Sequence, residues 1–67
     1  MSNDGALEYA CIAWNWALCG RTDLSSEYQN MAECALALET DEGPPAWETF
    51  RAEQILHDLH EKKMGRL

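Results

Sequence analysis

The sequence predicts an all-α protein, a helical hairpin followed by a third helix, that forms a homodimeric helical bundle. Three observations lead to this prediction. Apolar residues recur at helical spacing in three stretches, glycines and prolines separate those stretches, and no useful length of sequence alternates as a β-strand does. The expected helices cover about residues 5–19, 24–39 and 46–63, with a linker at 40–45, within a single domain of residues 1–67.

The first predicted helix, residues 6–19, is apolar nearly all round, because only Glu8 and Asn15 in it are plainly polar. A helix of this kind needs cover on most sides, so we expect it to be the central helix. Asn3 or Asp4 is expected to cap its start, and Gly20 to end it. One apolar seam comprises Leu7, Cys11, Trp14 and Leu18, and a second seam of small residues, suited to close approach of another backbone, comprises Ala6, Ala10, Ala13 and Ala17.

The second predicted helix starts after Thr22 or Asp23, either of which is a good N-cap residue. The connection to the first helix is so short that the two helices must pack antiparallel, as a hairpin. A heptad-like stripe indicates the face that packs in that hairpin, and it consists of Leu24, Tyr28, Met31, Ala35 and Leu38.

The third predicted helix follows the tandem helix breakers Pro44 and Pro45, and Pro45 suits its first position. Trp47 and Phe50 lie in its first turn. We expect them to clamp the end of the hairpin, and the alternative is that they anchor a partner. The buried face of this helix is expected to be Ala52, Ile55, Leu56 and Leu59, which follow the i, i+3, i+4, i+7 pattern.

The length and the cysteines set the class of protein. A chain of 67 residues is near the lower limit for an independent hydrophobic core, and small domains often add disulfides, a metal or a partner subunit. The three cysteines, Cys11, Cys19 and Cys34, are odd in number and at no framework spacing, so we expect reduced, buried thiols. The acidic first residues do not resemble a secretory signal, and the apolar run is too short for a membrane span. The expected location is the cytoplasm.

The charge is strongly acidic, with a net of −7. Residues 1–50 hold nine acids and one base, whereas residues 51–67 hold three acids and four bases. Such a balance disfavours direct binding to nucleic acid or to anionic membranes, and it favours a basic protein partner. The acidic surface expected to meet that partner comprises Glu27, Glu33, Glu39, Asp41, Glu42 and Glu48.

The sequence offers little catalytic chemistry. His57 and His60 stand three residues apart with Glu53, Asp58 and Glu61 nearby, but zinc needs three or four ligands and no cysteine lies close in sequence to supply the rest. The known two-histidine zinc motif, with i, i+4 spacing, is absent. Ser25 and Ser26 occupy a helix start, which is an ordinary place for serine. We therefore expect no enzymatic activity, no cofactor and no metal.

The function expected from these observations is to bind and modulate another protein. Exposed aromatic residues are typical of interaction hot spots. The expected dimer or partner interface consists of Tyr9, Trp14, Trp16, Tyr28, Met31, Trp47 and Phe50. A small acidic protein without catalytic groups suits an inhibitor of a host factor, encoded by a phage or mobile element.

Two alternatives remain open. The acidic residues could imitate a nucleic acid backbone and so occlude a DNA- or RNA-binding site on the partner. The third helix could instead bind DNA directly through Arg51, Lys62, Lys63 and Arg66, which is the less favoured alternative because of the overall negative charge.

Overall fold

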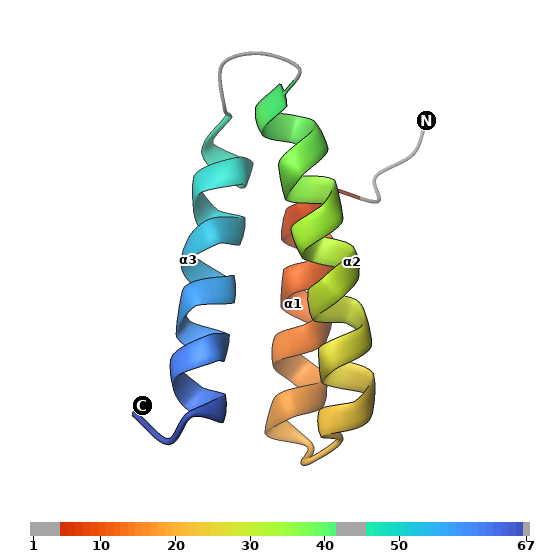
Figure 1. The fold of residues 1–67 in the computed structure, drawn as a ribbon, viewed down its shortest axis with the longest axis vertical. Coiled ribbons are helices and arrows are strands. Elements are labelled where there is room, and N and C mark those ends of the chain that lie inside the picture. The colour runs from red at the N-terminus through yellow and green to blue at the C-terminus, as the bar shows by residue number, and fades with distance from the viewer. Residues whose placement is uncertain (1–4, 42–45, 67) are drawn as a thin grey trace.

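The computed structural model describes residues 5–41 and 46–66, which form three α-helices and contain no β-strand. The helices are α1 (Ala6–Leu18), α2 (Thr22–Asp41) and α3 (Trp47–Lys63). The all-helical prediction is therefore confirmed, and each helix begins and ends within two residues of its predicted bounds. Figure 1 shows that α1 and α3 run in the same direction and that α2 runs antiparallel to both.

The short connection between α1 and α2 depends on one glycine. Gly20 has φ +83°, a left-handed conformation that side chains with a Cβ rarely adopt. The backbone N–H groups of Gly20 and Arg21 donate back to the carbonyls of Ala17 and Trp16, which closes the end of α1. Thr22 and Asp23 lie within α2 and do not precede it as caps. The predicted roles of Asn3, Asp4 and Pro45 lie outside the described residues.

Helix α1 is the central helix, since it packs on both α2 and α3 while those two meet each other least. Its small-residue seam forms the contact surface. Ala6, Ala10 and Ala13 are fully buried, whereas Cys11 and Leu18 of the larger seam are exposed. Alanine allows the helices to approach closely, and this leaves the larger side chains on the flanks of α1. The core cluster consists of Ala6 and Ala10 together with Ala32 from α2 and Ala52 and Leu56 from α3.

The heptad-like stripe of α2 is not its main buried face. The buried residues of α2 are Ser25 and Ala32, while Met31 is 37% and Leu38 is 66% exposed. Leu24, Tyr28 and Ala35 are half-buried, so the stripe lies on the flank of α2. The smaller side chains of Ser25 and Ala32 take the central position because the facing surface of α1 is lined with alanine.

Two further expectations are wrong. Trp47 and Phe50 do not clamp the hairpin, because they are 69% and 59% exposed. All three cysteines are exposed and free, so they are not buried thiols. The predicted buried face of α3 is confirmed for Ala52, Leu56 and Leu59, and Ile55 is half-buried.

Candidate functional site

A carboxylate joins the three helices at one end of the molecule. Glu39 of α2 accepts a hydrogen bond from the backbone N–H of Ala6, with 2.8 Å between N and Oε2. Its other oxygen, Oε1, accepts a hydrogen bond at 3.0 Å from the hydroxyl of Thr49 on α3. Ala6 is the first residue of α1, and its N-cap Gly5 provides no side-chain cap. Glu39 therefore supplies the negative charge that the N-terminus of α1 favours.

Steric fit as well as charge defines the contact between Glu39 and the N-terminus of α1. A Cβ placed on Gly5 would lie 3.1 Å from Oε2 of Glu39, which is tighter than an ordinary contact. Glu39 was expected on the acidic surface, but it is half-buried, and both of its oxygens are engaged in these hydrogen bonds. Its role in the described structure is to hold the helices together.

The opposite end carries a weaker tie between α2 and α3. The ammonium group of Lys63 donates to Oε1 of Gln29 at 2.7 Å and to Oγ of Ser26 at 3.2 Å. Partial burial lowers the pKa of Lys63, and the negative charge of Glu33 acts in the opposite direction. Ser26 and Lys63 are exposed and Gln29 is only half-buried, so solvent limits the contribution of these hydrogen bonds to stability.

The predicted interface residues lie on separate surfaces of the molecule. Tyr9 of α1 lies beside Tyr28 of α2, with 6.3 Å between the ring centroids. A shallow groove of about 420 Å³ continues from Tyr9 along α2 past Met31 and Leu38. We refer to this surface as the α2 face, and it consists of Tyr9, Tyr28, Asn30, Met31, Cys34, Ala35 and Leu38.

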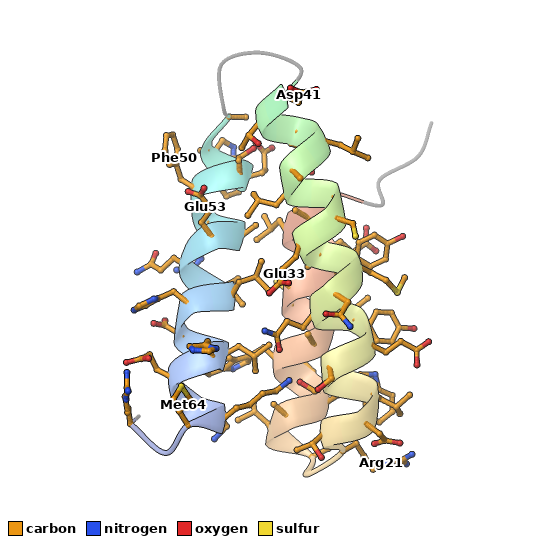
Figure 2. The ribbon with its side chains drawn as sticks, viewed as in Figure 1. Arg21, Glu33, Asp41, Phe50, Glu53 and Met64 are labelled. Carbon is orange, nitrogen blue, oxygen red and sulfur yellow. The ribbon has the colours of Figure 1, made fainter. Side chains whose placement is uncertain are left out.

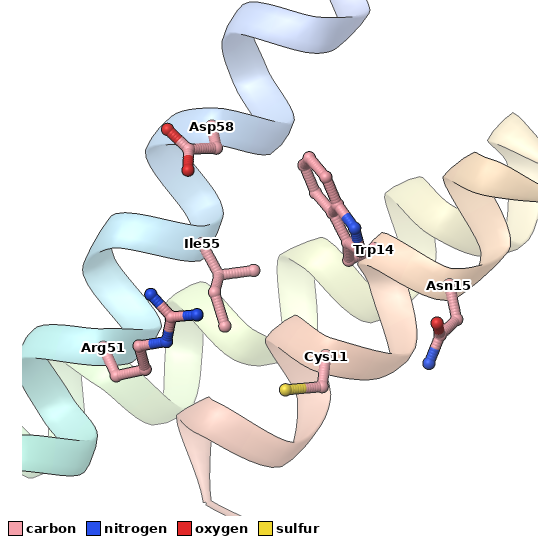
Figure 3. A pocket seen from close by; sticks show the side chains of 6 residues that line it. All are labelled: Cys11, Trp14, Asn15, Arg51, Ile55 and Asp58. Carbon is pink, nitrogen blue, oxygen red and sulfur yellow. The ribbon is translucent and has the colours of Figure 1, made fainter.

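A second groove, of about 360 Å³, lies between α1 and α3, and we refer to it as the α1–α3 groove. Figure 3 shows Trp14 and Ile55 facing one another across it, with the charged side chains of Arg51 and Asp58 on the α3 side. Its lining is Cys11, Trp14, Asn15, Arg51, Ile55 and Asp58. Only Trp14 of these was predicted as an interface residue. The sequence signal for the other residues was their helical spacing, at 11, 14 and 15 on α1 and at 51, 55 and 58 on α3.

The remaining predicted aromatic residues stand apart from both grooves. Trp16 is half-buried, and the guanidinium carbon of Arg21 lies 5.9 Å from its ring centroid. Trp47 and Phe50 are exposed on the first turn of α3, and Figure 2 shows Phe50 projecting away from α2. The structure thus brings Tyr9, Tyr28 and Met31 together and leaves the other four separate.

The predicted acidic residues do not form one row. Glu27 and Asp41 are exposed on α2 and Glu48 is exposed on α3. Glu33 accepts a hydrogen bond from Gln29 and its charge acts on Lys63, which places it on the side of α2 that faces α3. Glu42 lies outside the described residues.

The basic residues of α3 and the residues after it are largely engaged within the chain. Arg51 donates to Gln54, Lys63 donates to Gln29 and Ser26, and Arg66 forms a 3.3 Å ion pair with Glu61. Only the contact of Arg66 with Glu61 is an ion pair, since Gln54, Gln29 and Ser26 are neutral. The overall charge of −7 remains the argument against DNA binding through this helix.

His57 and His60 are both exposed on α3. Among residues 5–41 and 46–66, no three His, Cys, Asp or Glu side chains are gathered closely enough to hold a metal ion. None of the three helices, within those same residues, has the length and apolar character that crossing a membrane requires.

No protein-family model, curated protein or solved structure matches the chain.

Proposed function

We propose that this chain is a protein–protein interaction module that binds a basic protein partner through the α2 face and thereby modulates it. The observation that carries this proposal is the exposure of Met31 and Leu38 beside the Tyr9–Tyr28 pair, along a groove on an acidic protein. Aromatic residues and methionine are enriched at protein interfaces, and exposed apolar patches mark interaction sites.

The charge around the α2 face indicates the chemistry of the partner. Glu27 and Asp41 are exposed on the same helix, and α2 has five acidic residues and no basic one. A segment that presents lysines or arginines beside apolar side chains would complement this surface, and long-range attraction would speed its association. An amphipathic basic helix that lies in the groove is the simplest such segment.

The proposed role is inhibitory or modulatory by occlusion, with no catalytic chemistry and no cofactor. Imitation of a nucleic acid backbone has less support, because Glu33 lies on the side of α2 that faces α3 and Glu39 is engaged in contacts between the helices. The homodimer expected from the sequence is also part of the proposal, and it uses a different surface from the α2 face.

The experiment compares two methionine variants in partner capture from the native host. Met31→Lys places a positive charge in the α2 face, and Met64→Lys places the same charge after α3, where Met64 is 53% exposed. We expect the wild type and Met64→Lys to capture the same protein and Met31→Lys to lose it. The purified partner should then bind with an affinity that falls as salt is raised. Capture of the same protein by all three forms would contradict the proposed site.

A further inference from the structure

The side of α1 that faces solvent is almost free of charge. Glu8 is the single charged residue among the 13 residues of α1. Successive residues turn by about 100° in an α-helix, so residues 8, 11, 12, 15, 18 and 19 lie on one side of it. We refer to these as the α1 face: Glu8, Cys11, Ile12, Asn15, Leu18 and Cys19, of which Ile12 is half-buried and the others are exposed.

This composition is unusual for a helix surface in contact with water. The solvent side of an amphipathic helix normally carries charged and polar residues, whereas the α1 face includes two cysteines and a leucine that is 61% exposed. Figure 3 shows Cys11 and Asn15 on the same side of α1, next to the α1–α3 groove. The α1 face and the groove therefore form one continuous surface.

We infer that the α1 face and the adjoining groove pack against the same surface of a second copy of this chain, around a two-fold axis. This inference rests on the proposed homodimer and names its surface. Two copies that each carry a charge of −7 repel one another, so a stable contact between them requires a surface with little charge. The α1 face meets that requirement, whereas α2 carries five acidic residues.

The charges on the groove are suited to a two-fold contact. In such an interface, residue i of one copy meets residue j of the other, and the reverse contact also forms. Arg51 and Asp58 carry opposite charges on the same groove, so Arg51 of one copy can pair with Asp58 of the partner subunit, and the pair occurs twice. Asn15 has both a donor and an acceptor in its amide, and thus it can pair with the same residue across the axis.

The surface must extend beyond α1 to be large enough. A stable interface buries about 800 Å² on each partner. The 13 residues of α1 span only about 20 Å at 1.5 Å per residue, so the contact includes the adjoining groove and the α3 residues that line it. The core supplies a reason for a second copy, since five of the seven buried apolar residues in the described part of the chain are alanines. A chain this short with so little large apolar burial gains stability from a partner subunit.

The first test is the mass in solution of two matched asparagine variants. Asn15→Lys and Asn30→Lys make the same change at exposed helical positions, one on the α1 face and one on the α2 face. Light scattering at increasing concentration should give a dimer for the wild type and for Asn30→Lys. For Asn15→Lys we expect the dimer dissociation constant to rise by at least about tenfold, because the inserted charge is desolvated in the interface. Circular dichroism should show unchanged helix content.

The outcomes separate the inference from the proposed function. If the dimer is unaffected by Asn15→Lys but lost in Asn30→Lys, the α1 face is not the dimer interface, although the proposed homodimer itself is supported. A wild-type monomer up to hundreds of micromolar would overturn both the homodimer and this inference, and partner capture through the α2 face would be unaffected.

Thiol reactivity gives a second test that needs no charge change. Cys11 lies on the α1 face and Cys34 on the α2 face, and both are exposed in the single chain. In variants that keep one of these cysteines and replace the others by serine, maleimide labelling of Cys11 should slow as protein concentration rises, whereas labelling of Cys34 should not. Slowing at Cys34 alone, or no slowing at Cys11 in a confirmed dimer, would overturn the inference.

Discussion

Thr49 and Ser25 are buried hydroxyl residues at opposite ends of the molecule, and they differ in how their hydroxyls are satisfied. Thr49 is 3% exposed and donates to Glu39, which in turn accepts from the N-terminus of α1. Ser25 is fully buried, and its Oγ has no hydrogen-bond partner among the described residues. A buried hydroxyl stabilises a fold only when it is paired, and it is costly when it is not. One end of the bundle is therefore fastened by a buried polar contact, whereas the other end has an unpaired buried hydroxyl and the solvent-exposed hydrogen bonds of Lys63.

Glu39→Ala should have the largest effect, because it removes the acceptor for both Thr49 and the N–H of Ala6. We expect a loss of about 2–3 kcal/mol in the free energy of unfolding, since hydrogen bonds to a charged group are strong and Thr49 would be left unpaired. Urea denaturation followed by circular dichroism measures this. Glu27→Ala, at an exposed site on the same helix, serves as the control and should cost less than about 0.5 kcal/mol. Equal effects at the two sites would contradict the structural role of Glu39.

Thr49→Val tests the same end more gently, because valine has nearly the same shape and lacks the hydroxyl. The expected loss is about 1–2 kcal/mol, and a double variant with Glu39→Ala should lose less than the sum of the two. Thr40→Val, at an exposed threonine of α2, is the matched control. Additive losses would show that Thr49 and Glu39 do not act through one another.

Ser25→Ala tests the other end of the molecule. It should raise the free energy of unfolding, whereas Glu39→Ala and Thr49→Val should lower it. Removing an unpaired buried hydroxyl from a helix should stabilise the protein by about 0.5–1 kcal/mol, and alanine is also the better helix former. Ser26→Ala, next to it and exposed, is the comparison. A loss of stability in Ser25→Ala would mean that its hydroxyl is paired and that the two ends are alike.

Removal of the ion pair between Arg21 and Asp23, which lies near Ser25 in the chain, should have the smallest effect on stability. Hydrogen bonding from Arg21 is the main cause that lowers the pKa of Asp23 below its ordinary value of 3.8, with further help from the N–H of Leu24. A lowered pKa in the folded state means that the stabilisation is present above that ordinary value and is lost as the pH falls through the folded value. The melting temperature of the wild type should slightly exceed that of Asp23→Asn at pH 7, and the difference should vanish at low pH. A difference that persists in acid would rule out the ion pair as its source.

The helices could be predicted from the sequence because their ends depend on local residues such as Gly20. The faces that pack could not be predicted as well. The large apolar side chains of α2 form a clear stripe in the sequence. The residues of α2 that are buried are nevertheless Ser25 and Ala32, because the alanine surface of α1 leaves no room for larger side chains. Hydrophobicity ranks serine and alanine below leucine, so it does not reveal a contact that is decided by size.

The candidate surfaces could likewise be predicted only in part from the sequence. Tyr9, Tyr28 and Met31 were identified as apolar residues in excess of the core, and they share the α2 face. The contact of Glu39 with Ala6 joins residues 33 positions apart, and no local pattern indicates which acidic residue reaches a helix end. The α1–α3 groove likewise depends on how two parallel helices are aligned.

The alanine seam of α1 has a consequence for how the protein responds to temperature. Alanine has no side-chain rotamers to lose, so burying Ala6, Ala10 and Ala13 costs no side-chain entropy. The same residues bury little apolar area, and the heat capacity change of unfolding scales with that area. The single chain should therefore unfold with a small heat capacity change, and its stability should vary little between cold and warm conditions.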